Sequence, residues 1–399
     1  NTFLYSKLLI VILIGSGIYF TIRTRFPQVR LFRKACNAVM EKPEGKESVS
    51  SFQALMVSTA SRVGTGNIVG VSSAICIGGV GSVFWMWIIA ILGSASALAE
   101  STLAQIYKKK GEDGRCYGGP AYYIEAALHS RGLAVVFCIA MILTYAFGFN
   151  MLASYNLQST FASQPFYNAD ITPWIIGGIL ALVMGWCLLG GGNRIVKVTS
   201  TLVPFMGIAY ILVSLLVVVL NIGQLPSVMA QIFKEAFDFK AIFAGFAGSA
   251  MMQGIRRGLY SNEAGIGSAP NAAASAVVSH PVKQGLVQML SVFIDTLLLC
   301  TATAMMCLVS GVIPAKELQG APWVQAALHK TLGSFGPYFI MIAMVLFAFT
   351  TLLGNCFYCD NLLTYIHKKQ PDRKFMTGFR IVSALAVFWG AGMEMTLLW

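Results

Sequence analysis

Ten apolar stretches dominate the chain. Each is about long enough to cross the hydrocarbon core of a membrane, which takes about 20 helical residues. Composition agrees, because 56% of the 399 residues are hydrophobic and only 11% are charged, whereas about a quarter of the residues in a soluble domain are charged. The sequence therefore predicts an all-α polytopic membrane protein. The stretches lie at 8–22, 50–79, 83–107, 133–159, 173–190, 198–221, 240–270, 284–312, 335–366 and 376–396.

Basic residues are distributed unevenly between the predicted loops. If the spans alternate in direction from an N-terminus outside the cell, the loops on one side carry 19 Lys and Arg residues and those on the other carry 5. The positive-inside rule places the richer side in the cytoplasm. Most of the basic residues behind the net charge of +12 then lie next to the membrane surface. The charge therefore gives no reason to expect a nucleic acid as partner.

Polar, glycine-rich segments interrupt two of the stretches, at 61–67 and at 253–265. Unwound backbone is tolerated at membrane depth only where it lines a protein cavity, because no water is present to satisfy its N–H and C=O groups. A pair of interrupted helices, one in each half of a chain, marks the substrate and ion site of a secondary transporter. The candidate substrate-binding residues at these breaks are Gly64, Thr65, Gly66, Asn67, Gln253 and Gly254.

The spacing of the stretches divides the chain into two groups that each open with an interrupted helix. Five stretches fall in 50–221, and an odd number of crossings inverts the next group, 222–399, relative to the first. The sequence thus predicts a 5+5 inverted repeat. Residues 1–49 precede it as one extra, peripheral transmembrane helix and a cytoplasmic segment that forms either a surface helix or a solvated loop. The second group shows only four helices, so we expect a final helix to be missing.

The first break has chemistry that suits a zwitterion and a cation. A helix that begins at 64–66 offers unpaired N–H groups and a partial positive charge, which attract a carboxylate. The half-helix that ends before it exposes carbonyl oxygens of the opposite polarity, and hard monovalent cations prefer such oxygens. Ala60 and Val63 are therefore candidate sodium ligands.

Five segments of the chain carry a recognisable pattern. They are 63–68, 84–87 with 99–100, 118–125, 257–265 with 267–270, and 293–296. Together these segments resemble the alanine or glycine:cation symporter family. The likeness covers nearly the whole chain, and it implies sodium-coupled uptake of a small amino acid on a leucine-transporter-type fold, with Na⁺ as the co-transported ion. We expect a monomeric functional unit in the plasma membrane, here the cytoplasmic membrane of a prokaryote.

The resemblance extends the expected site to the helix at 335–366. Thr350 and Thr351 resemble the hydroxyl pair that completes a sodium site in this fold, although a mid-helix threonine also commonly bonds to the preceding turn. The chain departs from the family pattern at 152–156 and at Asn355, where the family has Gln and Trp respectively. Both departures could line the pocket and admit a larger amino acid such as glutamine.

The break at Gln253 and Gly254 leaves two interpretations open. These residues either face the ligand or form a small-residue contact between helices.

Ionisable residues inside the predicted spans are expected to have a function or a partner. Arg62 is a candidate partner for Glu100, holding the broken helix, whereas Glu263 is expected to bind the freed amides of its own break. Asp295 is a candidate for an ion pathway or for bracing helices.

Three other functions are weighed against sodium symport. Proton coupling through Asp295 or Glu263 is the nearest alternative, and an ion channel is less well supported because a single chain with paired breaks does not suggest a pore around an axis. An intramembrane enzyme is disfavoured, because all four histidines fall near span ends.

Overall fold

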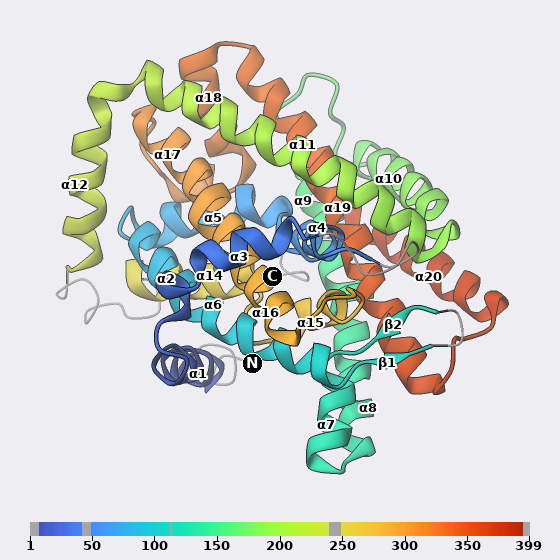
Figure 1. The fold of residues 1–399 in the computed structure, drawn as a ribbon. Coiled ribbons are helices and arrows are strands. Elements are labelled where there is room, and N and C mark those ends of the chain that lie inside the picture. Colours follow the sequence, from blue (N-terminus) through green and yellow to red (C-terminus); the bar gives the residue numbers. More distant parts are fainter. Residues whose placement is uncertain (1–7, 42–48, 112–113, 239–248, 394–399) are drawn as a thin grey trace.

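The computed structural model describes residues 8–41, 49–111, 114–238 and 249–393, and it is almost entirely helical (Figure 1). Within these residues the strands are β1 (Lys109–Lys110) and β2 (Cys116–Tyr117), which pair antiparallel. The described part contains six helical segments that are long and apolar enough to span a membrane, which confirms an all-α polytopic protein. These segments are Ser82–Ile106, Arg131–Ser159, Thr172–Leu189, Gly191–Leu220, Pro281–Val309 and Phe335–His367.

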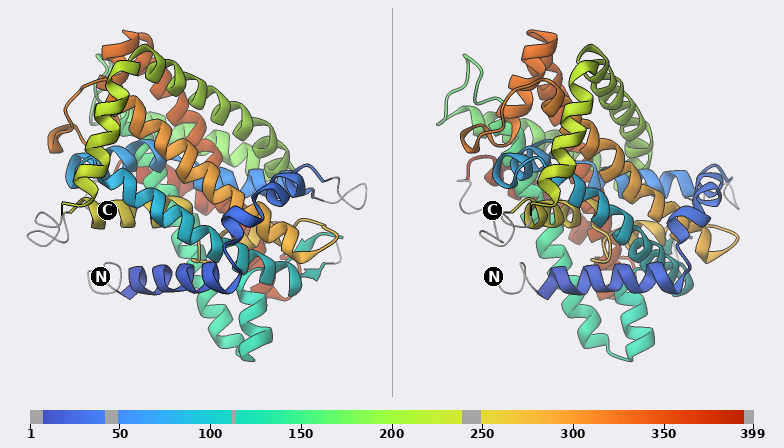
Figure 2. Two further views of the ribbon diagram at one scale, coloured as in Figure 1. Left: turned by 60° about the vertical axis from the view of Figure 1, so that its left-hand side comes forward. Right: turned by 90° about the vertical axis from the view of Figure 1, so that its left-hand side faces the viewer.

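The N-terminal part consists of α1 (Leu9–Arg23), α2 (Pro27–Arg30) and α3 (Phe32–Val39). Helix α1 runs along the outside of the molecule, where it packs on α6 (Figure 2). Helix α3 buries Ala35 and Ala38 and packs on α16. The segment expected as either a surface helix or a loop is thus helical through Val39, and residues 42–48 lie outside the described part.

The first interrupted helix is confirmed as two helices, α4 (Ser51–Arg62) and α5 (Thr65–Gly78). Val63 leaves the helical region at ψ 87°, and Gly64 is extended at φ −132° and ψ −167°. The side-chain oxygen of Asn67 then accepts a hydrogen bond from the Gly64 amide at 3.1 Å and so caps the start of α5. The break therefore occupies positions 63 and 64, one residue earlier than predicted.

The second interruption begins near the end of the predicted segment 253–265 and not at its start. Helix α14 (Ala250–Asn262) is continuous through Gln253 and Gly254, so the expectation of a break there is wrong. The chain leaves the helix at Glu263, which adopts the left-handed conformation at φ 50°, and it resumes helical structure in α15 (Ala269–Ala273).

Packing explains the glycine at position 254. A Cβ atom there would lie 2.7 Å from Cβ of Trp85 and would also meet the carbonyl oxygen of Ser82, both on α6. Gln253 lies on the same turn, and its Cβ contacts Gly78 at the end of α5. Gly254 thus allows two helices to approach closely, which is the second of the two interpretations that the sequence left open.

Two of the spans contain π-helical turns, η2 between α8 and α9 and η5 between α16 and α17. Such turns often occur at functional sites. The remaining elements are α6 (Ser82–Ile106), α7 (Pro120–Leu128), α8 (Arg131–Ile142), η2 (Leu143–Gly148), α9 (Phe149–Ser159), α10 (Thr172–Leu189), α11 (Gly191–Leu220), η3 (Ile222–Gln224), α12 (Leu225–Ala236), α16 (Pro281–Val292), η5 (Phe293–Cys300), α17 (Thr301–Val309), η6 (Lys316–Leu318), α18 (Ala321–Leu332), α19 (Phe335–His367) and α20 (Arg373–Ala391).

The interrupted helices lie inside the bundle. Helix α4 packs against α11 and α19, while α5 packs against α14, and α6 packs along both α14 and α16 (Figure 1). The outer helices instead expose large apolar side chains, such as Leu182 on α10, Phe205 on α11 and Trp389 on α20. Apolar surface of this extent is typical of an exterior that faces lipid. The broken helices lie behind this exterior, inside the bundle, where a ligand can be enclosed.

Candidate functional site

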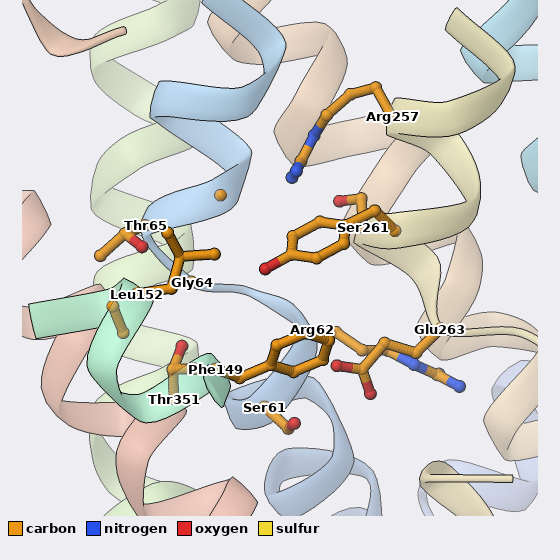
Figure 3. Close-up of a pocket in the computed structure, with 13 residues that line it drawn as sticks. Ser61, Arg62, Gly64, Thr65, Phe149, Leu152, Arg257, Ser261, Glu263 and Thr351 are labelled. Atoms are coloured by element: carbon orange, nitrogen blue, oxygen red, sulfur yellow. The ribbon is translucent and has the colours of Figure 1, made fainter. Parts of the chain in front are cut away.

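A cavity lies at the first helix break, where α4, α5, α9, α14 and α19 meet (Figure 3). It holds about 380 Å³ of space not filled by protein atoms, including the part that opens to solvent. The lining residues are Ser61, Arg62, Gly64, Thr65, Gly66, Phe149, Leu152, Ala153, Arg257, Tyr260, Ser261, Glu263 and Thr351.

The start of α5 presents backbone donors to this cavity. The first amides of a helix have no acceptor within the helix, and the aligned peptide dipoles give this end a partial positive charge. Asn67 takes the amide of Gly64, while Thr65 and Gly66, the next two residues, line the cavity. Asn156 on α9 fixes the Thr65 side chain through a 3.2 Å hydrogen bond to its hydroxyl. This end of α5 is therefore suited to an anionic group.

Arg257 brings a full positive charge to the same place. Its side chain is only 6% exposed and reaches from α14 toward the start of α5 (Figure 3). A Cβ atom at Gly66 would lie 2.8 Å from Nη2 of Arg257, and one at Gly70 would also meet the guanidinium. These two glycines make room for the arginine. A guanidinium beside a positive helix terminus needs a compensating charge. Asp295 acts on this guanidinium from within the protein, and the Tyr260 ring lies 5.1 Å from it, so a ligand carboxylate would add to compensation that is already present.

Arg62 is a second buried arginine at the cavity, with 3% of its surface exposed. None of its three side-chain nitrogens has a hydrogen-bond partner among the described residues. The expected ion pair with Glu100 is therefore not formed. Arg62 instead acts at longer range as a positive charge on both Glu100 and Glu263, and Glu263 also lines the cavity.

Glu100 performs the task that the sequence assigned to Glu263. Its two oxygens accept hydrogen bonds from the amides of Gly265 at 3.2 Å and Gly267 at 3.0 Å, inside the second break. Glu263 accepts instead from the hydroxyl of Ser268 at 2.7 Å. The backbone freed by the second break is therefore bound by a carboxylate from the neighbouring helix α6.

Asp295 connects three elements of the core. Its carboxylate accepts hydrogen bonds from Asn67 at 2.7 Å, from Ser261 at 2.8 Å and from Thr296 at 2.8 Å. Asn67 is the residue that caps α5, and Ser261 lines the cavity. Asp295 thus braces the broken helix, which is one of the two roles expected for it.

The four residues expected to bind sodium lie at the meeting of α4 and α19. Ala60 and Val63 are fully buried at the end of α4. The Thr351 hydroxyl lies so close to Gly64 that no Cβ would fit there, and it has no hydrogen-bond partner in the described part of the chain. Thr350 differs, because its hydroxyl donates to the carbonyl of Leu346 at 2.9 Å. Thr351 is therefore free to bind an ion, whereas Thr350 bonds to its own helix.

The two departures from the family pattern fall in different places. Leu152 and Ala153 line the cavity, as expected. Asn355 is not among the lining residues, because its side chain is used in packing: it accepts a hydrogen bond from Ser61 at 2.6 Å and donates one to Asn150 at 2.9 Å. A change at Asn355 would therefore reach the cavity through neighbouring residues such as Ser61, which lines it.

Sequence reasoning missed the side chains that two intact helices contribute to the cavity. Arg257, Tyr260 and Ser261 follow one face of α14, and Phe149 lies one turn before the expected Leu152 on the same face of α9. The signal was present in their spacing of three and four residues, which places them on one face of a helix. It could be used only once the break itself had been located.

These features define a polytopic membrane protein with an internal cavity at a helix break, lined by two arginines and one glutamate. The sodium:alanine symporter family model matches residues 1–399, and the chain belongs to this family. It is 44% identical over 402 residues to the probable sodium/glutamine symporter GlnT of Bacillus subtilis, covering 100% of this chain and 82% of that protein.

Two other relatives have similar coverage. The putative sodium/proton-dependent alanine carrier protein YrbD of Bacillus subtilis is 42% identical over 413 residues, which cover 100% of this chain and 84% of that protein. The sodium/alanine symporter AgcS of Methanococcus maripaludis is 36% identical over 409 residues, covering 100% of this chain and 88% of the relative. The names of these relatives agree on cation-coupled transport and differ in the amino acid and the ion.

Proposed function

We propose that the protein takes up a small neutral amino acid, alanine or glycine, together with sodium, by alternating access. The observation that carries this proposal is the cavity that places the start of α5, the Arg257 guanidinium and the free Thr351 hydroxyl around one space. Membership of the sodium:alanine symporter family gives the substrate class and the ion. Glutamine is a third substrate to test, since it appears in the name of GlnT.

The amino acid binds through its charged groups in this proposal. Its carboxylate meets the amides of Thr65 and Gly66 and the guanidinium of Arg257, while its ammonium group turns toward Glu263. The side chain then faces Phe149 and Leu152, which are the apolar part of the lining. An apolar wall of this kind favours a short aliphatic side chain over a charged one, because burying an unpaired charge is costly.

Sodium binds next to the amino acid, with ligands from the carbonyl oxygens of Ala60 and Val63 and from the hydroxyl of Thr351. The unpaired state of that hydroxyl supports this placement, because a buried polar group without a partner costs about 1–3 kcal/mol. Thr350 would have to give up its bond to Leu346 to join the site, so Thr351 is the stronger candidate.

Alternating access would use the two interrupted helices as its centre. We propose two inverted repeats, 50–221 and 222–399, preceded by a peripheral N-terminal segment, 1–49, with the N-terminus outside. The supporting observation is that α4 and α5 open the first of these regions with a break, while α14 and α15 form an interrupted pair early in the second. Rocking of one repeat against the other would expose the cavity to each side in turn.

Uptake into liposomes tests the proposal directly. One sodium ion gains about 2.3 kcal/mol from a 100 mV potential and about 1.4 kcal/mol from a tenfold gradient, which supports roughly several-hundred-fold accumulation. We expect labelled alanine and glycine to accumulate with an inward sodium gradient and not when potassium replaces sodium. Uptake that is unchanged without sodium would contradict the proposal.

Proton coupling is the second candidate, and the buried carboxylates Glu100 and Glu263 favour it. The name of YrbD also mentions both ions. An inward proton gradient applied in sodium-free buffer separates the two candidates. Accumulation under these conditions would assign the coupling to protons, and its absence would leave sodium as the driving ion.

A further inference from the structure

One face of the span formed by α16 and η5 carries a row of buried polar side chains. Gln284, Gln288, Ser291 and Asp295 follow one another at intervals of four, three and four residues, and each is 0% exposed. Residues at these intervals lie on the same side of a helix. The row, which we call the polar stripe, is unusual because the segment is one of those long and apolar enough to cross a membrane.

The two ends of the polar stripe differ in hydrogen bonding. Asp295 is bound by three donors, and the Ser291 hydroxyl lies 3.2 Å from that of Thr59 on α4. By contrast, neither the nitrogen nor the oxygen of Gln284 or Gln288 has a partner anywhere in the described residues. Each buried amide atom left in this state costs about 1–3 kcal/mol. Two adjacent turns with this cost indicate that the side chains are satisfied by something other than the described part of the chain.

The stripe has the length needed to connect the ligand site to one face of the membrane. The eleven residue-to-residue steps of helix from Gln284 to Asp295 rise about 16 Å, which is about half of the 30 Å hydrocarbon core. At its inner end, Asp295 contacts Ser261, a residue that lines the cavity. At its outer end, α16 begins at Pro281 beside Lys283, in the loop that the distribution of basic residues places in the cytoplasm.

The stripe is closed in this structure, since each of its four side chains is 0% exposed. We propose that it opens into a hydrated route along which a small monovalent cation passes between the ligand site and the cytoplasm. Amide and hydroxyl oxygens are ligands that hard cations accept, and water can bridge them where polar groups are otherwise unpaired. Asp295 provides a negative charge at the inner end. This inference rests on the proposed cation coupling, and it adds the path of the ion and the residues that form it.

Cysteine accessibility tests the route without a transport assay. Gln288→Cys and Gln284→Cys are made in the full chain, with Leu286→Cys as the matched control. Leu286 lies between them on α16, is 5% exposed and packs in an apolar cluster with Ala35 and Leu98. Inside-out and right-side-out vesicles are treated with methanethiosulfonate ethylammonium, a small cation, and the modification of each peptide is followed by mass spectrometry.

We expect both stripe cysteines to react at least about tenfold faster than Leu286→Cys, from the cytoplasmic side only. The anionic sulfonate reagent of similar size should react more slowly than the cation. Equal rates at positions 286 and 288 would overturn the route, and equal rates for the two reagents would overturn its assignment to a cation.

Native cysteines keep the test valid if a variant fails to fold. The sulfur of Cys300 lies 3.2 Å from the Ser261 hydroxyl at the inner end of the stripe, whereas Cys307 is buried two turns further along, among apolar residues. The proposal expects Cys300 of the wild-type protein to be modified from the cytoplasmic side before Cys307, and the opposite order would contradict it. Wild-type vesicles that show this order but no sodium-dependent uptake would overturn the proposed function and leave the hydrated route in place.

Discussion

The two helix breaks differ in what becomes of the backbone that they free. The break between α4 and α5 is only two residues long, and it leaves the first amides of α5 facing the cavity. The break that follows α14 is longer, and its amides at Gly265 and Gly267 are bound by Glu100. In the proposed site, ligand recognition is therefore divided: the first break contributes backbone, whereas α14 contributes the side chains of Arg257, Tyr260 and Ser261.

Of the changes considered, replacing Arg257 should have the largest effect on uptake. We expect Arg257→Gln to lower alanine uptake about a hundredfold, because the loss of a charged hydrogen-bond partner costs up to about 3 kcal/mol. Arg256→Gln is the control, since Arg256 directly precedes Arg257 on α14 and is not among the lining residues. Initial rates in liposomes check the pair. Equal losses in both variants would remove Arg257 from the proposed site.

Gly66→Ala should have the next largest effect. The new Cβ would displace the Arg257 guanidinium without removing its charge, so we expect uptake to fall about thirtyfold, which corresponds to about 2 kcal/mol. Gly185→Ala on α10 is the control, because a Cβ at that position meets nothing within 4 Å. Folded yield should match the control. A Gly66→Ala variant with wild-type uptake would show that Arg257 need not lie against α5.

The variants Thr351→Val and Thr350→Val test which of the two adjacent hydroxyls binds sodium. Of these two threonines, Thr351 is the one whose hydroxyl has no partner among the described residues. We therefore expect its replacement to raise the sodium concentration for half-maximal uptake about tenfold, which corresponds to a loss of about 1.4 kcal/mol in sodium binding. The Thr350 variant should change it less than threefold, since that hydroxyl bonds to Leu346. Sodium titrations of uptake measure both. A larger effect at Thr350 would reverse the assignment.

Glu100→Gln should have the smallest effect on transport and a clear effect on stability. Gln keeps one acceptor oxygen for the two amides of the second break, so we expect a loss of roughly 2 kcal/mol in stability with less than a threefold change in uptake. Glu317→Gln, at an exposed position, is the control. Thermal unfolding in detergent checks the difference. Unchanged stability with abolished uptake would instead place Glu100 in the transport mechanism.

The sequence predicted the helical class and the first break because both follow from local chemistry. Apolar length determines a span, and Gly64 is followed by Asn67, which caps the new helix. The second break was misplaced because glycine has two uses. Gly254 serves close packing against α6, and nothing local to the sequence distinguishes that from unwinding.

Only the part of the site that follows from local chemistry was predicted. Thr65 and Gly66 could be assigned from the break alone, whereas the partner of each charged side chain depended on which helices pack together. Glu100 lies far from Gly265 in the chain, so its bond to that amide could not be read from spacing. Asn355 was expected at the cavity, and it is held by Asn150 instead.

A structure of the protein with bound alanine and sodium, obtained by electron cryo-microscopy, tests the central claim most directly. The account predicts the alanine carboxylate within hydrogen-bond distance of the Thr65 and Gly66 amides and of the Arg257 guanidinium. Alanine bound instead with its carboxylate on the Gly265 and Gly267 amides, with Glu100 displaced, would contradict it.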